Sequence, residues 1–356
     1  MSVSSSVSSS VSPNATTQAA SGRAGGVSRK AGGALAGAAL VVLALAPLAA
    51  GASPYMLGLL ISALILSGLA LSWALLGNLG GMVSFGHAAF FGVGAYASAL
   101  LAGKLGVPVL LAIPLGGLVA TVFSLAMLPT LRLSGPYFAL AILAYAQIFR
   151  ILATELDWLT GGAAGLQRYP GLPTVLGFNL AERAGSYVLV LACVVLFAIV
   201  YMVLRRSHVG TALRAIADSE DATRVVGVNA TVLKTWMLLL SAFIAGVFGA
   251  LNAHIIGFLE PDYAFSGIWS VMPIIAAVFG GYRSVLGPIV GAVVIYLFDQ
   301  VIAKSLIPVG HQILLGILLA IMVLLAPNGL AGLAARLLPS RRSAKRLSNA
   351  SEKGHA

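Results

Sequence analysis

The sequence has 356 residues, of which 59% are hydrophobic and 9% are charged, and its mean hydropathy is +1.00. Soluble domains carry roughly a quarter charged residues, so this composition excludes a soluble globular protein and indicates a membrane protein. The 21 basic residues outnumber the 10 acidic ones, but they gather in predicted loops and tails, which favours membrane orientation over nucleic-acid binding.

The first thirty residues are rich in Ser, Thr, Ala and Gly and contain no aromatic side chain. We therefore expect 1–30 to be a disordered cytoplasmic tail. The apolar run over 31–50 follows Arg23, Arg29 and Lys30, and we interpret it as a first membrane helix. A cleaved signal peptide is the alternative, although the run is longer than the usual apolar region of such a peptide.

Long intervals without a charged side chain make up most of the chain, such as 31–103 and 235–259. A membrane-spanning helix needs roughly 20 mostly apolar residues. We predict an all-α polytopic membrane bundle over 31–333, with about ten helices (8–11), some of them broken or re-entrant. The candidate spans are 32–50, 56–76, 88–103, 108–128, 137–154, 186–204, 234–256, 268–281, 286–303 and 309–326.

The basic residues set the predicted orientation. With the N-terminus in the cytoplasm, 16 of the 21 fall on the inner side, as the positive-inside rule requires. Both termini are then cytoplasmic, 334–356 is a basic cytoplasmic tail, 155–185 is an outer loop and 205–234 is an inner loop. The five basic residues outside this pattern are Lys104, Arg150, Arg168, Arg183 and Lys304.

The stretch GNLGGMVSFGHAAFFGVGAY, residues 77–96, holds six glycines and no charge. Glycine is a poor helix former, so we expect a helix break over 77–86. A broken helix at membrane depth exposes backbone polar groups, which are tolerated only where protein covers them or where they line a cavity. Asn78, Ser84, Phe85 and His87 are therefore candidates to line a pathway, and simple packing is the alternative for His87.

Small residues recur at helical spacing in several spans, a pattern that lets membrane helices approach closely. We expect these stripes to pack against another helix of this chain or against a partner. A second break over 280–287 is predicted from its glycines. The packing residues are Gly94 and Ser98 in one span, Ser241, Ala245 and Gly249 in a later one, and Gly287 and Gly291 after the second break.

Few ionisable residues fall within the spans. Arg150 and Asp299 lie near the outer ends of theirs, and such ions are functional candidates by default. Arginine also snorkels to the interface, so substrate contact and a structural role both stay open. The histidines show no spacing typical of a metal site, and we expect no metal and no catalytic residue; they are His87, His208, His254, His311 and His355.

The inner loop over 205–234 shows helix punctuation. Ser219 is a favourable N-cap followed by the acids Glu220 and Asp221, and Gly227 suits the end of a helix. We predict two short helices here, the second over about 220–226. Helices this short are not stable alone in water, so we expect them to dock on something; a solvated, mobile loop is the alternative.

The first of the two helices has an apolar face. Val209, Leu213 and Ile216 share it, while Arg214 and Asp218 lie off it.

Several segments resemble a known family. ABC-importer permeases share a coupling motif, Glu-Ala-Ala-x3-Gly. A similar pattern occurs here, with Asp221-Ala222-Thr223 followed, after three more residues, by Gly227. Other segments resemble, in order, those of the branched-chain amino acid ABC permeases of the M type. They are GNLGGMVSFGHAAFFGVGAYASALL, LRLSGPYFALAILAYAQIF, LTGGAAGL, RRSHVGTALRAIADSEDATRVVGVN, GGYRSVLGPIVGA and APNGLAG.

The resemblance implies an importer of the bacterial inner membrane, in which the outer loop is periplasmic. Its partners are a second homologous permease subunit, two cytoplasmic ABC ATPases, a periplasmic amino-acid-binding protein and the lipid bilayer. ATP and Mg²⁺ are held by the ATPases, and this chain lacks a Gly-x4-Gly-Lys-Ser/Thr phosphate loop. The implied coupling residues are Gly210, Arg214, Asp218, Glu220, Asp221, Ala222 and Gly227, and the outer motif adds Thr160, Gly161 and Gly162 to the pathway candidates.

Two departures and three alternatives remain. Ala164 stands where the family commonly has Asn, and Arg283 where it commonly has Gly. Related permeases serve urea or short amides, so the substrate stays open between these and branched-chain or related amino acids. A stand-alone channel or secondary transporter is disfavoured by the scarcity of intramembrane carboxylates. A membrane enzyme is disfavoured by the absence of clustered acids and histidines.

Overall fold

The structure is a computed structural model that describes residues 51–332, apart from positions 134, 176, 308–309, 311, 326–328 and 331. The predicted tails and the candidate span 32–50 lie outside the described residues. The described residues from Pro54 onward form one compact unit, and each of the other nine candidate spans coincides with a helix.

The described chain is almost entirely helical, which confirms the predicted all-α membrane bundle. Seven of the helical stretches in this part are long and apolar enough to cross a membrane. The elements are α2 (Pro54–Ala74), η1 (Leu75–Leu79), α3 (His87–Lys104), α4 (Val109–Ser124), η2 (Leu125–Arg132), α5 (Pro136–Glu155), α6 (Asp157–Thr160), η3 (Gly162–Ala164), β1 (Thr174–Val175), β2 (Phe178–Asn179), α7 (Arg183–Arg206), α8 (His208–Asp218), α9 (Glu220–Val225), α10 (Ala230–Ile256), α11 (Pro261–Ala264), α12 (Ile268–Gly280), α13 (Leu286–Leu297), η4 (Phe298–Ala303), α14 (Lys304–Leu306) and α15 (Gln312–Leu325).

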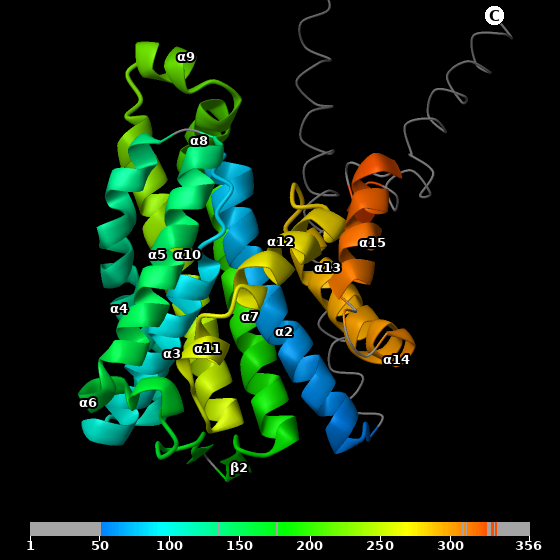
Figure 1. Cartoon of the computed structure of the whole chain (residues 1–356). Helices are drawn as coiled ribbons and strands as arrows, with labels where there is room; N and C mark the ends of the chain where they lie inside the picture. Colours follow the sequence, from blue (N-terminus) through cyan, green and yellow to red (C-terminus); the bar gives the residue numbers. More distant parts are fainter. Residues whose placement is uncertain are drawn as a thin grey trace, which may run out of the picture. The chain divides into compact units, whose positions relative to one another are not determined.

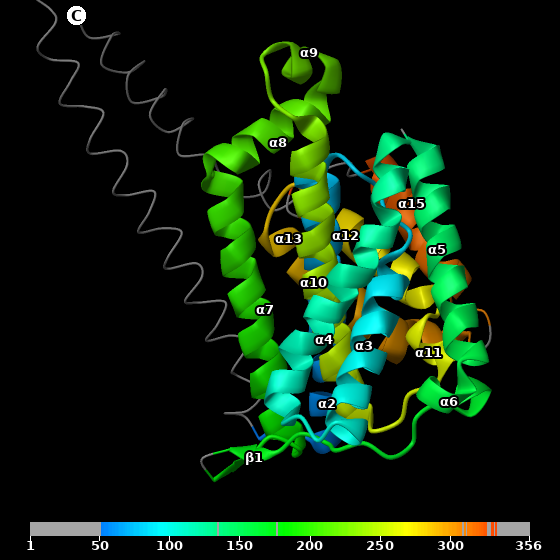
Figure 2. The ribbon, with the colours of Figure 1, turned by 90° about the vertical axis from the view of Figure 1, so that its left-hand side faces the viewer.

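Helix α2 is the centre of this unit. It is apolar on all sides, as expected of a helix that is buried all round, and it contacts α7, α10, α12 and α13. Figure 1 shows α12, α13 and α15 on the side of α2 away from α4, while α3, α4 and α10 pack together on the other side. The short helices α8 and α9 lie at one end, and α6 and the β1–β2 hairpin lie at the opposite end (Figures 1 and 2).

Glycines bring α3, α4 and α10 into backbone contact. A Cβ built on Gly94 of α3 would overlap the carbonyl oxygen of Gly246 in α10, and one on Gly249 would overlap the carbonyl oxygen of Phe91. A Cβ on Gly116 of α4 would lie 2.6 Å from the carbonyl oxygen of Gly94. The small-residue stripes are thus occupied by contacts within this chain.

The first helix break is shorter than the sequence suggests. The prediction that Gly77 interrupts the helix is wrong, because the chain continues through it as the π-helix η1. Leu75, Leu76 and Leu79 are fully buried there and hold that turn in place. The chain leaves helical geometry after Gly80, and Gly81 adopts a φ of +66°.

Helix α3 begins inside the bundle. Its first residue, His87, is hydrogen-bonded to Ser241, which is hydrogen-bonded in turn to Ser72. Ser72 precedes Leu79 by seven residues, which is about 10 Å along a helix. The segment 80–86 therefore runs from the α8–α9 end into the interior (Figure 1).

The second break lies between α12 and α13. Gly281 ends α12 with a φ of +97°. A Cβ on Gly287 would overlap the carbonyl oxygen of Gly281, and one on Gly291 would overlap that of Ala276. The predicted break over 280–287 is therefore a tight helical hairpin whose two arms touch through glycines.

We predict that Gly94→Ala destabilises the protein although alanine is the better helix former. The added methyl group meets backbone atoms of Gly246, which cannot rotate away, and overpacking of this kind costs about 1–3 kcal/mol. Gly58→Ala in α2 is the matched control, because no atom lies within 4 Å of its built Cβ. Thermal unfolding of the detergent-purified chain should show a lower Tm for Gly94→Ala and an equal or higher one for Gly58→Ala; equal losses would contradict the packing.

Candidate functional site

A cavity of about 1160 Å³ opens at the α8–α9 end of the unit. It is bounded by the break after η1, by the start of α5, by α8 and α9, and by the first turns of α10. Its lining includes Gly81 and Phe85 from the break and Asp218, Glu220, Asp221 and Lys234 from the coupling region. Residues from the predicted break and from the predicted coupling loop thus share one cavity.

Helix α8 folds back onto the end of α7. The Ser207 side chain caps it by accepting a hydrogen bond from the Gly210 amide at 3.2 Å. Gly210 is buried, and a Cβ there would overlap the carbonyl oxygen of Leu204. The Arg214 guanidinium closes the corner by donating to the Arg205 carbonyl oxygen at 3.1 Å.

The predicted apolar face of α8 is correct in two of its three members. Leu213 and Ile216 are buried, but Val209 is 40% exposed. Gly210 takes the buried position instead, because the sharp α7–α8 turn presses the α8 backbone against α7 at that point.

The predicted second helix is confirmed as α9. The Ser219 side chain accepts a hydrogen bond from the Ala222 amide at 3.4 Å, and its carbonyl oxygen accepts one from the Thr223 hydroxyl at 2.7 Å. Gly227 follows the helix with a φ of +85°, in the left-handed region that glycine adopts most easily.

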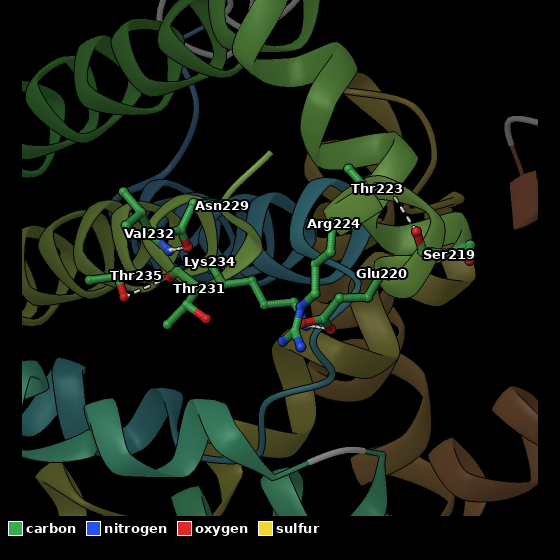
Figure 3. Close-up of polar contacts among 9 residues, drawn as sticks. All are labelled: Ser219, Glu220, Thr223, Arg224, Asn229, Thr231, Val232, Lys234 and Thr235. Carbon is green, nitrogen blue, oxygen red and sulfur yellow. Dashed lines mark hydrogen bonds and ion pairs between the residues drawn. The ribbon is translucent and has the colours of Figure 1, made fainter. Parts of the chain in front are cut away.

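Glu220 forms one ion pair within α9 and a second that ties α9 to α10 (Figure 3). Arg224 donates to Glu220 Oε1 at 2.7 Å, and Lys234 of α10 donates to Glu220 Oε2. The hydrogen bond from Lys234 is the main cause that lowers the pKa of Glu220, and Arg224 adds to it. Sequence reasoning missed this cluster: Arg224 has the i,i+4 signal, but Lys234 meets Glu220 only because the chain turns back between α9 and α10.

The break itself touches α8. A Cβ built on Gly81 would lie 3.1 Å from both the Cα and the Cβ of Ala217. A larger residue fits there only if Ala217 gives way by a few tenths of an ångström, and the positive φ of Gly81 also favours glycine. A shift of α8 therefore acts directly on the segment that leads into α3.

Of the pathway candidates near this break, Phe85 lines the cavity. Asn78 instead donates to the Tyr201 hydroxyl at 2.7 Å, and the Ser84 hydroxyl accepts from the Gly86 amide at 3.2 Å. His87 Nε2 lies 3.1 Å from Ser241 Oγ. The contacts of His87 are those of the packing alternative.

The outer-motif candidates lie at the opposite end. Thr160 donates to the Ala153 carbonyl oxygen at 2.6 Å and accepts from the Gly162 amide at 3.3 Å. An antiparallel β-bridge between Leu166 and Leu259 then fixes the loop that follows this motif. The structure does not bring Thr160, Gly161 and Gly162 together with Phe85 or the coupling helices.

Two further predicted polar residues have structural partners. Arg150 forms an ion pair with Asp262 of α11 at 2.7 Å. The small residue Ser98 in α3 lies 2.9 Å from His254 Nε2, which joins α3 to α10.

Comparison with known proteins finds relatives among membrane permeases. The family described as "branched-chain amino acid transport system / permease component" matches residues 55–326. The chain is 30% identical over 304 residues to the high-affinity branched-chain amino acid transport system permease protein LivM of Salmonella typhimurium, covering 78% of this chain and 68% of that protein. It is 29% identical to LivM of Escherichia coli K12 over the same shares.

A more distant relative is the ribose import permease protein RbsC of Haemophilus influenzae. It is 22% identical over 138 residues, which are 38% of this chain and 43% of that protein. No solved structure matches the chain.

We predict that Lys234→Met loosens α9 at neutral pH, because Glu220 then keeps only its partner within the same short helix. A fluorophore attached at Asp221→Cys, in a Cys193→Ser background, reports the local motion through its anisotropy. We expect a lower anisotropy in Lys234→Met and no change in Thr235→Val, whose hydroxyl bonds only to Thr231 in its own helix.

The same label tests the pH dependence. Because the folded-state pKa of Glu220 is lowered, its ion pairs stabilise α9 fully above the ordinary glutamate pKa of about 4.3 and lose that effect as the pH falls through the lower folded-state pKa. The anisotropy should fall on acidification below about pH 4, and the fall should start at higher pH in Lys234→Met. Superimposable titrations would refute the role of Lys234.

Proposed function

Because the chain belongs to the permease family of branched-chain amino acid transport systems, we propose that it is a membrane-spanning subunit of an ATP-driven, binding-protein-dependent importer. Its substrates are branched-chain or related amino acids. The chain sits in the bacterial inner membrane with both termini in the cytoplasm. The α8–α9 end is then the cytoplasmic end.

The complete importer contains other subunits. A second, homologous permease subunit pairs with this chain, two cytoplasmic ATPases bind and hydrolyse ATP, and a periplasmic protein delivers the amino acid. The relatives named as permease proteins of high-affinity transport systems support this division of labour. Within it, this chain supplies the pathway and the surface on which one ATPase docks.

The contact between Gly81 and Ala217 carries the proposal. Helices α8 and α9 are exposed at the end of the bundle, where an ATPase can reach them, and α8 leans on the broken segment before α3. Glu220 makes a second connection, since Lys234 links it to α10. A force applied to the coupling helices thus has two short routes into the bundle.

Alternating access follows from these two routes. ATP binding draws the ATPases together and displaces α8 and α9, which in turn reposition the segment 80–86 and the start of α10. Such coupling requires that the docked helices contact the two ATPase states with different free energies. Asp221 and Gly227 matter here for different reasons: the first presents a charge in the first turn of α9, and the second lets the chain leave that helix.

We predict that Asp221→Lys and Gly227→Val each abolish ATP-driven leucine uptake by the reconstituted importer while the subunits still assemble. The lysine reverses a charge on the docking surface. Valine is strained at a φ of +85°, by about 1–2 kcal/mol. Glu182→Lys, at the other end of the bundle, is the matched control and should transport normally. Normal uptake by both coupling variants would exclude α9 as the coupling element.

A disulfide tests the route through Gly81. Its built Cβ lies 3.1 Å from the Ala217 Cβ, close to the roughly 3.5–4.5 Å that a disulfide spans. We predict that Gly81→Cys/Ala217→Cys in a Cys193→Ser background loses uptake when oxidised and regains it when reduced, because the crosslink fixes the break to α8. Each single cysteine variant should be indifferent to oxidation. Full uptake by the crosslinked protein would show that this contact need not change during transport.

A further inference from the structure

A second cavity of about 600 Å³ lies between α12, the π-helix η4 and α15. Its volume falls within the roughly 300–1,000 Å³ typical of small-molecule sites. It is distinct from the cavity at the coupling helices, and the two share only Phe85 among their described lining residues. Phe85 is the one pathway candidate among its described lining residues, and the intramembrane acid Asp299 is another of them.

The walls of this cavity are of two kinds. One side is apolar and includes Met272, Ile275 and Leu315, which belong to the hydrophobic cluster between α12 and α15. Most of the cavity surface is apolar, and polar residues border it along one edge. They are Tyr296, Asp299, Gln300, Lys304 and Gln312.

The polar edge carries an ordered pair of opposite charges. Asp299 Oδ2 accepts a hydrogen bond from Gln300 Nε2 at 3.2 Å, and Gln300 Oε1 accepts one from Lys304 Nζ at 2.9 Å. The Gln300 amide thus separates a carboxylate from an ammonium. Asp299 is only 2% exposed, and because a buried acid in a membrane span is costly, such a residue is a functional-site candidate.

The backbone at this point is also unusual. Asp299 and Gln300 lie in η4, a six-residue π-helical stretch between α13 and α14. Single-turn π-bulges inside α-helices occur often at functional sites. Here the turn places Asp299 and Gln300 side by side on the cavity wall.

Phe85 connects this cavity to the first one. It belongs to the broken segment 80–86 and lines both cavities. The Phe85 ring lies four residues after Gly81, the residue that contacts α8, and borders both cavities. Any displacement of the segment moves that ring.

We propose that the cavity beside Asp299 binds the transported amino acid and that the Phe85 ring closes it off from the cavity at the coupling helices; this inference rests on the proposed function. The ammonium group of the substrate faces Asp299 and its carboxylate faces Lys304. Its branched side chain packs against Met272, Ile275 and Leu315. A neutral amide such as urea matches neither charge and leaves the apolar wall uncovered.

Transport by the complete reconstituted importer, with its binding protein and ATPases, tests the site. Hydrogen bonds to charged groups contribute about 1.5–3 kcal/mol, so Asp299→Asn and Lys304→Gln should each lower leucine uptake about 10- to 100-fold. Glu182→Gln, which removes a charge from the exposed loop before α7, is the control and should leave uptake unchanged. Wild-type uptake from Asp299→Asn would overturn the assignment.

The gate has its own readout. Proteoliposomes preloaded with labelled leucine should lose it about tenfold faster without ATP when the importer carries Phe85→Ala, the change expected when a barrier falls by about 1.4 kcal/mol. Phe123→Ala in α4 is the control, because that ring packs on Phe149 and lines neither cavity. Equal efflux from the two variants would contradict a gate at Phe85.

A labelling experiment covers the case in which the charge variants fail to fold. Met272→Cys in a Cys193→Ser background places one thiol on the apolar wall of the cavity. Leucine should slow the reaction of this cysteine with a thiol reagent, while urea should not. The control is a thiol at Trp158→Cys, an exposed position at the far end, which should react at the same rate with leucine, with urea and with neither. An unprotected thiol at position 272 would overturn the binding site.

The two failures are distinguishable. If the wild-type importer takes up no leucine with ATP and binding protein, the proposed function is wrong. If it takes up leucine but Asp299→Asn, Phe85→Ala and the labelled cysteine all behave like their controls, the function stands and only the location of the site and its gate is wrong.

Discussion

The membrane interior offers no water to backbone N–H and C=O groups, so a broken helix is tolerated only where protein covers its polar groups or where they line a cavity. The segment between η1 and α3 meets this requirement. The Trp73 indole donates to the Ser84 carbonyl oxygen at 2.9 Å, the Ser84 hydroxyl accepts from the Gly86 amide, and the Ser270 hydroxyl accepts from the Ala88 amide at 3.1 Å. These partners come from α2 and α12 as well as from the segment itself. The break therefore exists only because other helices surround it.

The glycine contacts are a consequence of the same constraint. For α10 to cover the start of α3, the two backbones must come so close that no side chain fits between them. Gly94, Gly246 and Gly249 permit that approach, and Ser98, Ser241 and His254 add hydrogen bonds along it. Because lipid tails are as apolar as leucine, such close packing and interhelical hydrogen bonding replace the hydrophobic effect as the force between helices.

The two charged clusters differ in what surrounds them. Glu220 lies at the surface, where water screens its ion pairs and makes each of them weak. These pairs suit a hinge that must hold α9 against α10 and still yield to a docking protein. Asp299 is buried in an apolar setting, and a hydrogen bond from Gln300 connects it to the exposed Lys304. The first cluster fits the transmission of movement and the second fits the recognition of a charged ligand.

The sequence by itself determined the class, the spans and the local punctuation. Runs of apolar residues predicted nine helices that the structure contains, the Ser219 cap predicted α9, and the glycines marked both breaks, because these features depend on residues close together in the chain. The tertiary structure decided what touches what. It carried the helix through Gly77, exposed Val209, set Lys234 against Glu220 and left Phe85 at the border of two cavities. Each of these outcomes depends on how helices distant in sequence pack against one another, and no local pattern of residues encodes that.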